Sequence, residues 1–281
     1  MEKYVLVGEN ISYTLSPKLH KIFFQEMGID GEYGIEDGSG KGKKESFLES
    51  IVSRIRRGDL KGANITVPYK EEILKYIDIL DSEARKIGSV NTLVLENGKI
   101  KGYNTDYIGV LATLNKMKIN IRDRKVYILG NGGSAKAVFH AVIIGGGIPY
   151  IISRNPNNEN NQIPKIKNMM SYSDMEKMVL GEEKESILIN TTPIGNMNHL
   201  NISPVSQNIA EKFQAILDLH YRPLKTKLME YSPNSENGLY MLTVQGIESE
   251  KIWNKNLDFS NKKDIIEKIY ENLKEELEKN E

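Results

Sequence analysis

The stretch Val126–Ala137 reads VYILGNGGSAKA: a short apolar run, then a glycine-rich turn, then residues that favour a helix. Gly130, Gly132 and Ala135 follow the spacing GxGxxA. In this arrangement the first glycine permits a tight turn, the second lets a pyrophosphate approach the backbone, and the alanine lets the helix pack closely. Because glycine-rich turns also occur without a ligand, the motif by itself leaves a purely structural turn open.

Short apolar runs and helix-like segments alternate on the carboxyl side of this motif. The runs YIIS, ILIN and AILDL stand at 150–153, 187–190 and 215–219, and residues 134–144 have a helical pattern. This rhythm is typical of a parallel sheet whose strands are joined by crossover helices. It predicts a Rossmann-type dinucleotide-binding domain.

The second strand of this domain ends in Ser153, Arg154 and Asn155. An acidic residue at this place would bind the ribose 2′-hydroxyl of NAD, whereas a guanidinium pairs with the 2′-phosphate of NADP. Arg154 therefore favours NADP, and a solvated surface arginine is the alternative. The polar run that continues to Gln162 is expected to form a mobile loop.

The N-terminal part shows a second mixture of strands and helices, which predicts another α/β domain. Ser16-Pro17 reads as a helix start, with the serine hydroxyl as the N-cap, and Gly28 reads as the end of that helix. The expected strands are 3–7 and 63–67, and the expected helices are 16–27, 46–57 and 71–80, with further helices at 238–249 and from 263.

The clearest local signal is SVNTLVLENGKIKGYNTD at 89–106, where Asn97-Gly98 separates two alternating runs. Asn-Gly is the favoured two-residue turn of a β-hairpin. Counting outward from this turn places Asn91 opposite Asn104, with Asp106 just beyond. Turn geometry thus predicts that Asn91 and Asp106 reach one edge and line a common cleft.

A lone lysine follows the strand at 63–67. Pro68 cannot donate to a β-ladder, so the strand stops there and Lys70 emerges at its end. From these residues alone, a solvated lysine at a helix start is as good an interpretation as a functional amine.

The chain has 281 residues, which is long for one compact core and favours two domains. Its 38 basic and 38 acidic residues cancel, so bulk charge indicates neither nucleic acid nor a membrane as a partner. It has no cysteine, and its four histidines form no i, i+4 pair, so no metal site is predicted. Because no leader peptide and no apolar run of roughly 20 residues is seen, the expected location is the cytoplasm.

Several segments, in one order along almost the whole chain, resemble motifs of the shikimate dehydrogenase family. A chance match to all of them is not a reasonable explanation. The segments are YTLSPKLH (13–20), ANITVPYK (63–70), SVNTL (89–93), GYNTD (102–106), NTTPIG (190–195), DLHYRPLKT (218–226) and GLYMLTVQG (238–246).

The resemblance implies an α/β protein of two domains. It places a substrate-binding catalytic domain at 1–106, an NADP-binding Rossmann domain at 107–238, and C-terminal helices that return to the catalytic domain at 239–281. Enzymes of this family reduce 3-dehydroshikimate to shikimate with NADPH, on the route to chorismate and the aromatic amino acids. The implied partner is therefore a small-molecule substrate, and the chain is expected to be a monomer or a homodimer.

The resemblance also implies site residues. Lys70 is expected to act as general acid and base, and Asp106 to pair with it and with a substrate hydroxyl. The expected substrate contacts are Thr14, Ser16 and Tyr221 to the carboxylate, and Thr66, Asn91 and Gln245 to ring hydroxyls. The expected cofactor contacts are Gly130, Asn131, Gly132, Gly133, Ser134, Ser153, Arg154 and Asn155, with Leu219 and Gly238 beside the nicotinamide. For Leu219 and Gly238, the alternative to cofactor binding is a simple packing role. For Ser16, the alternative to substrate binding is capping of the helix.

Three positions depart from the family pattern. Thr14 stands where serine is usual, which adds a methyl group to the carboxylate pocket and leaves discrimination against quinate open. No second basic residue follows Arg154, and Tyr107 replaces a glycine, which implies a stiffer hinge. The alternatives are a dual-specificity quinate/shikimate dehydrogenase using NAD or NADP, and a non-catalytic cofactor-binding sensor. A sensor has no need of a proton donor, so Lys70 and Asp106 favour an enzyme.

Overall fold

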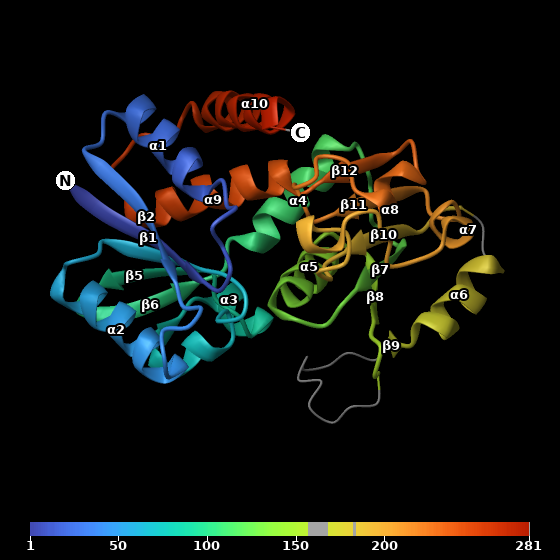
Figure 1. Cartoon of the computed structure of the whole chain (residues 1–281), viewed down its shortest axis with the longest axis horizontal. Helices are drawn as coiled ribbons and strands as arrows, with labels where there is room; N and C mark the ends of the chain where they lie inside the picture. Colours follow the sequence, from blue (N-terminus) through green and yellow to red (C-terminus); the bar gives the residue numbers. More distant parts are fainter. Residues whose placement is uncertain (157–167, 182–183, 281) are drawn as a thin grey trace. The chain divides into compact units, whose positions relative to one another are not determined.

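The computed structural model describes residues 1–156, 168–181 and 184–280, so residues 157–162 of the predicted polar loop lie outside the described part. The chain forms two compact units (Figure 1). The first unit contains Met1–Asp106 and Leu242–Leu273, and the second contains Tyr107–Met241 and Lys274–Glu281. The assignment of substrate and cofactor to these units stays a prediction.

The first unit is built on a mixed six-stranded sheet. Its strands are β1 (Glu2–Gly8), β2 (Gly31–Asp37), β3 (Gly62–Ile65), β4 (Ile79–Leu80), β5 (Thr92–Glu96) and β6 (Lys99–Tyr103). They lie in the order β2-β1-β3-β5-β6-β4. The pairs of β1 with β2 and with β3 are parallel, whereas β5 runs antiparallel to β3 and to β6.

Helices cover both faces of this sheet. They are α1 (Ser16–Met27), α2 (Lys44–Arg57), the 3-10 helix η1 (Glu72–Tyr76), α3 (Ser82–Ile87), α9 (Leu239–Trp253) and the first part of α10 (Lys262–Asn280). Side chains alternate along β1, so successive residues face different helices. Val5 and Val7 join the apolar cluster of α2, while the Tyr4 ring packs against Phe24 of α1 and Trp253 of α9.

The β5–β6 hairpin has the predicted register. Glu96 pairs with Lys99 across the turn, and the ladder runs outward to the pair of Thr92 with Tyr103. Beyond the last pair, the Asn91 N–H still donates to the Tyr103 carbonyl at 3.0 Å. The Asn-Gly turn therefore brings the two ends of the hairpin together, as the sequence indicates.

Residues 71–80, predicted as a helix, fold instead as η1 followed by strand β4. The Asp78 N–H donates to the Ile100 carbonyl at 3.0 Å, and the Asp78 carboxylate accepts the Ile100 N–H at 2.6 Å. These bonds draw the chain onto β6, to which β4 pairs in parallel. The tertiary contact outweighs the helical pattern of the segment.

Helix α1 begins without the predicted hydroxyl cap at Ser16. The N-cap is Leu15, which makes no side-chain cap bond, and Ser16 is already helical. Thr14 accepts the Ser16 N–H through its Oγ1 at 3.2 Å. The helix end is as predicted, since Gly28 closes it in the left-handed conformation with φ of 65°.

The second unit is a parallel six-stranded sheet. Its strands are β7 (Lys125–Leu129), β8 (Ile148–Ile152), β9 (Met169–Met170), β10 (Ile187–Asn190), β11 (Ala215–Asp218) and β12 (Ser235–Asn237). They lie in the order β12-β11-β10-β7-β8-β9, and every pair is parallel. The strand order reverses between β7 and β10, which is the switch point of a doubly wound sheet.

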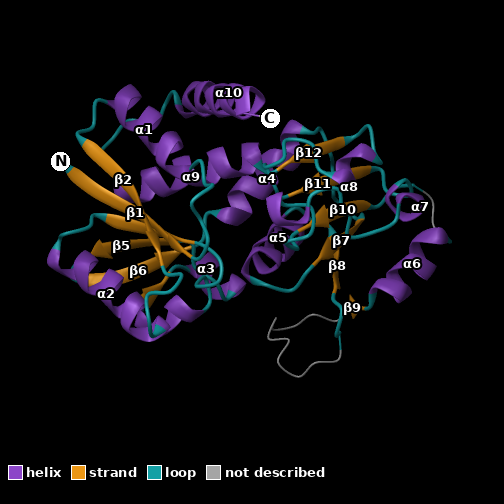
Figure 2. Cartoon of the chain, viewed as in Figure 1, coloured by secondary structure: helices purple, strands orange, loops and turns teal. Residues whose placement is uncertain are grey.

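Helices lie on both faces of this second sheet (Figure 2). They are α4 (Asp106–Lys116), α5 (Gly133–Ile144), α6 (Tyr172–Leu180), η2 (Met197–His199), α7 (Gln207–Ala210) and α8 (Lys227–Glu230). Val138 and Val142 of α5 belong to the apolar cluster of one face, and Met175 of α6 and Leu228 of α8 belong to the other. The predicted α/β class with a Rossmann-type unit is confirmed.

A buried polar pair fixes α9 to α1 in the first unit. Nδ1 of His20 lies 2.5 Å from Oε1 of Glu250, and neither side chain is more than 1% exposed. Burial raises the pKa of the Glu250 carboxyl, against the opposing effect of its bonds with His20 and Asn254. The His20 ring also stacks on Tyr33 of β2 with 3.8 Å between centroids. A late helix is thus part of the core of the N-terminal sheet.

Asp37, at the end of β2, holds the loop that follows β1. Its Oδ1 accepts the Asn10 N–H and its Oδ2 accepts the Ile11 N–H, both at 3.2 Å. Hydrogen bonds, first from Ser39 and then from these two N–H groups, lower the pKa of Asp37 to about 2. Because this loop leads to residues 14–16, Asp37 supports the start of α1.

We expect Asp37→Asn to remove a stabilisation that depends on pH. The folded state lowers the pKa of this carboxyl from 3.8 to about 2, so its contribution is fully present above 3.8 and is lost as pH falls toward 2. In urea unfolding, the free energy of unfolding of the wild type should exceed that of the variant at about pH 6. The difference between the two free energies should shrink toward about pH 3. Asp59→Asn, at an exposed aspartate paired with Arg57, controls for the loss of charge. A wild-type advantage that stays constant over this range would contradict the prediction.

Candidate active site

The first unit buries a lysine against an aspartate. Lys70 follows β3 after Pro68, and its carbonyl accepts the Val90 N–H at 2.9 Å, which fixes the backbone that carries the amine. The Lys70 Nζ donates to Oδ2 of Asp106 at 2.6 Å. Their side chains are only 11% and 5% exposed, so this lysine is not a solvated one. A buried amine and carboxylate paired in this way are typical of an acid–base site.

The second oxygen of Asp106 is also held. Asn91 donates through Nδ2 to Oδ1 of Asp106 at 2.8 Å, and the Asp106 N–H donates to Oδ1 of Asn104 at 3.1 Å. Oε1 of Gln245, on α9, lies 3.1 Å from the same Asn91 nitrogen. The structure therefore brings four predicted residues together: Lys70, Asn91, Asp106 and Gln245.

Two other predicted hydroxyl residues lie at the start of α1. The Thr14 hydroxyl donates to Oγ of Ser16 at 3.1 Å, so the hydrogen of Ser16 remains for another acceptor. A helix N-terminus favours negative charge, which suits a carboxylate at this place. Thr66 lies just past β3, where its N–H donates to the Val7 carbonyl at 2.9 Å.

The glycine-rich turn of the second unit lies at the switch point of its sheet. Gly130 ends β7 with φ of 106°, and a Cβ there would lie 2.7 Å from Oγ1 of Thr191, the residue after β10. A Cβ on Gly132, the N-cap of α5, would meet nothing within 4 Å. Open space beside a helix start fits a pyrophosphate. The remaining predicted residues of the turn are Asn131, Gly133 and Ser134.

The predicted 2′-phosphate residues follow β8. Ser153 is buried and accepts the Asn155 N–H at 3.3 Å, while Arg154 is exposed. Burial raises the pKa of Tyr172, at the start of α6, and the Arg154 charge acts against this rise. The Ser153 N–H donates to the Met170 carbonyl at 3.1 Å, so Arg154 follows β8 beside the end of β9, at the same end of the parallel sheet as the turn after β7.

Leu219 and Gly238 lie against each other in the second unit. The Gly238 N–H donates to the His220 carbonyl at 2.8 Å, and a Cβ on Gly238 would lie 2.0 Å from the Leu219 carbonyl oxygen. No other residue type fits at position 238 without moving the backbone. Leu219 also packs on the apolar cluster of α5, and Tyr221 follows two positions later. Close packing thus accounts for this glycine whether or not a nicotinamide binds beside it.

Sequence reasoning missed the buried polar residues behind Asn91. Thr105 Oγ1 accepts from the Asn91 amide at 2.9 Å, and Thr92, Asn64 and Ser249 continue the hydrogen-bonded cluster. Two signals were present in the sequence. Asn64 is a polar residue in a short apolar strand, and Ser249 stands four positions after Gln245, on the same face of its helix.

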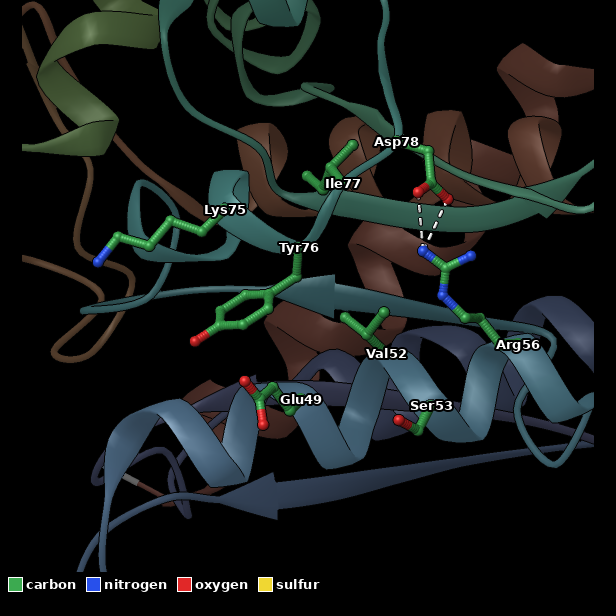
Figure 3. Close-up of a pocket in the computed structure, with 8 residues that line it drawn as sticks. All are labelled: Glu49, Val52, Ser53, Arg56, Lys75, Tyr76, Ile77 and Asp78. Atoms are coloured by element: carbon green, nitrogen blue, oxygen red, sulfur yellow. Dashed lines mark hydrogen bonds and ion pairs between the residues drawn. The ribbon is translucent and has the colours of Figure 1, made fainter.

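A pocket of about 350 Å³ lies on the first unit between α2 and the segment 75–78 (Figure 3). Arg56 and Asp78 form an ion pair at 2.8 Å in its lining, and none of the predicted site residues contributes to it. The part of the chain that the structure describes holds no group of three or more residues suited to bind a metal ion. Among the described helices, none has the length and apolar character needed to cross a bilayer.

Comparison with known proteins relates both units to one family. The family model for the shikimate dehydrogenase substrate binding domain matches residues 6–93. The chain is 37% identical over 259 residues to shikimate dehydrogenase (NADP(+)) of Clostridium beijerinckii, covering 90% of this chain and 92% of the relative.

Solved structures are similar to this chain over nearly its full length. The crystal structure of shikimate dehydrogenase 1 from Peptoclostridium difficile superposes with a TM-score of 0.85 at 33% identity and covers 99% of both chains. The crystal structure of shikimate 5-dehydrogenase of Thermus thermophilus, in complex with NADP(H) and shikimate, superposes with a TM-score of 0.76 at 28% identity. It covers 96% of this chain and 100% of the other. The chain therefore belongs to the shikimate dehydrogenase family.

Proposed function

We propose that this chain reduces 3-dehydroshikimate to shikimate with NADPH, a step toward chorismate and the aromatic amino acids. The observation that carries the proposal is the buried pair of Lys70 and Asp106, 2.6 Å apart, in a member of this family. The relatives with the name shikimate dehydrogenase (NADP(+)) support both the substrate and the cofactor. The first unit supplies the acid and all the substrate contacts except Tyr221, and the second supplies the cofactor contacts. We place the enzyme in the cytoplasm, where its lack of cysteine suits a reducing medium.

Lys70 serves as the proton donor for the ketone oxygen. Its ammonium donates to the oxygen on which negative charge develops, and a positioned acid contributes roughly 100- to 10,000-fold to such a step. Asp106 accepts a hydrogen bond from the amine, which holds Lys70 in one orientation. Burial of the pair keeps bulk water from competing for the amine. In the reverse direction the same amine removes the hydroxyl proton.

Several polar side chains bind the substrate. Ser16 donates to the carboxylate at the start of α1, where Thr14 also binds it if the Thr14 hydrogen turns from Ser16 to the substrate, and Tyr221 assists them. Thr66 and Gln245 bind ring hydroxyls, together with Asn91 and Asp106. The methyl group of Thr14 makes the carboxylate pocket smaller than a serine would, and quinate, with its extra hydroxyl, is the substrate that tests this difference.

The second unit holds NADP, which supplies the hydride when bound. Gly130 and Gly132 admit the pyrophosphate at the start of α5, with Asn131, Gly133 and Ser134 around it. Arg154 pairs with the 2′-phosphate, and Ser153 and Asn155 flank it. Leu219 and Gly238 form the surface beside the nicotinamide.

The direct test is consumption of NADPH with 3-dehydroshikimate as the only acceptor. Turnover supports the proposal, and its absence with a folded protein refutes it and favours a cofactor-binding sensor. Parallel assays in the reverse direction, with shikimate or quinate and with NADP or NAD, decide whether the enzyme has dual specificity.

We predict that Lys70→Ala lowers kcat by roughly 100- to 10,000-fold, because it removes an interaction made mainly in the transition state. Substrate affinity, measured by titration, should stay within about tenfold. Lys61→Ala, which removes a lysine just before β3, is the matched control and should retain kcat. Because the variant leaves Asp106 buried without its partner, which destabilises the fold, circular dichroism is used to check that the variant is folded. Wild-type kcat in a folded Lys70→Ala enzyme would exclude Lys70 as the acid.

We predict that Arg154→Ala raises the KM for NADPH by about 10- to 100-fold, because a charge-assisted hydrogen bond is worth roughly 1.5 to 3 kcal/mol. The KM for NADH, which lacks the 2′-phosphate, should change little. Arg122→Ala, at an exposed arginine before β7, is the matched control. If NADPH kinetics do not respond to the loss of Arg154, another group binds the 2′-phosphate.

A further inference from the structure

We propose that Thr92 and Ser249 are positioning residues for the acid. Through their hydroxyls they orient the Asn91 amide, and Asn91 in turn fixes Asp106 against Lys70. The inference rests on the proposed function, because it concerns the same acid–base pair. Both hydroxyls are completely buried, at 0% exposure, so each depends on protein partners alone.

The orientation of Asn91 is set by a group that can only donate. Oδ1 of Asn91 accepts the backbone N–H of Thr105 at 2.8 Å. The amide nitrogen must therefore point the other way, toward Oδ1 of Asp106 at 2.8 Å. A flipped amide would place its NH₂ group against the Thr105 N–H and its oxygen against a carboxylate.

Thr92 supplies the second hydrogen bond to the same amide oxygen. Its hydroxyl donates to Oδ1 of Asn91 at 2.9 Å. With these two donors and the more distant Thr105 hydroxyl, at 3.3 Å, on its oxygen, the amide is held in one plane. Its N–H groups become better donors because linked hydrogen bonds polarise one another. The hydroxyl of Thr92 is thus two hydrogen bonds away from Asp106.

Ser249 determines where the Thr92 hydrogen goes. The two hydroxyl oxygens lie 2.8 Å apart. Either hydroxyl can donate in this contact, and we assign the hydrogen to Ser249 because the single hydrogen of Thr92 is then donated to Asn91. The other acceptors near Ser249 are the Gln245 carbonyl, one helical turn earlier at 3.0 Å, and Oγ1 of Thr105 at 3.3 Å. The shorter contact, to Thr92, is the one that completes the chain of donors.

The chain of donors begins at β2. The Tyr33 hydroxyl donates to Oδ1 of Asn64 at 2.7 Å, and Nδ2 of Asn64 donates to Oγ of Ser249 at 2.9 Å. From Tyr33 through Ser249 to Asn91, every hydrogen bond therefore points the same way and ends on Asp106. We call this series Tyr33–Asn64–Ser249–Thr92–Asn91 the relay. It connects β2, β3, α9 and β5 to the carboxylate.

The relay leaves Asp106 one oxygen for Asn91 and the other for Lys70. Asn91 has two amide hydrogens, and three acceptors surround them: Asp106, Thr105 and Gln245 at 2.8, 2.9 and 3.1 Å. Both amide hydrogens of Asn91 therefore have acceptors within the protein. Positioning Asp106 is therefore the main task of Asn91, and contact with a substrate hydroxyl is secondary.

The first test is Thr92→Val, which replaces the hydroxyl by a methyl group of similar size. We expect kcat to fall by about tenfold and the KM for NADPH to stay within about twofold. Thr92→Ser keeps the hydroxyl and should restore most of the activity. Thr113→Val is the matched control, because Thr113 is equally buried and its hydroxyl bonds only the Gly109 carbonyl of its own helix. An unchanged kcat in Thr92→Val, or no rescue by serine, would overturn the proposal.

The second test is Ser249→Ala, alone and combined with Thr92→Val. Each single change cuts the same relay, so the double variant should lose no more kcat than the more damaged single variant. Losses that multiply would show two independent sites and overturn the relay. Ser249→Ala also decides the case if Thr92→Val fails to fold.

A crystal structure of Thr92→Val separates this inference from the proposed function. We expect the Asn91 amide to turn away from Oδ1 of Asp106, whether or not the wild type reduces 3-dehydroshikimate. An Asn91 amide with its wild-type orientation and contact would overturn the relay. Lack of wild-type turnover would refute only the function.

Discussion

The burial of Lys70 with Asp106 constrains the whole first unit. Removing either charge from water costs several kcal/mol, and the cost is recovered only if each remaining hydrogen-bonding site finds a partner. The unit meets this demand by placing polar side chains of β3, β5 and α9 behind the pair, among otherwise apolar residues. The polar interior is therefore a condition for burying an amine inside this unit, and it specifies where α9 must lie.

The second unit meets a different constraint, which is to pack its backbone closely at the edge where its parallel strands end. Parallel strands on each side of the switch point end next to each other, so the turn after β7 and the residues after β10 share one edge. Gly130 and Gly238 stand where a Cβ would collide with a neighbour. Buried polar side chains thus distinguish the first unit, and closely packed glycines distinguish the second.

Local signals in the sequence were sufficient for much of this structure. The Asn97-Gly98 turn fixed the hairpin register, and the glycine spacing after an apolar run indicated the Rossmann-type unit. One failure depended on a distant partner: residues 71–80 left the helical pattern because Asp78 bonds to Ile100. The other was local: Ser16 is already helical, and its N–H donates to Thr14 two positions earlier. Strand β2 was missed because its glycines and acids are poor strand formers, and its pairing with β1 outweighs that preference. The polar cluster behind Asn91 could not be predicted, since a single sequence does not reveal which Thr or Ser meets which amide.

The pair of His20 with Glu250 has a consequence for synthesis on the ribosome. Its partners are 230 positions apart, and Trp253 donates to the carbonyl of Leu93, which lies 160 positions earlier. The N-terminal sheet is therefore synthesised first. One of its faces stays uncovered until translation has passed position 253, the end of α9. The segment between, which is continuous from 107 to 241, has its full set of strands sooner. The sheet of the first unit is thus synthesised first but covered late, and the nascent chain exposes apolar surface in the meantime.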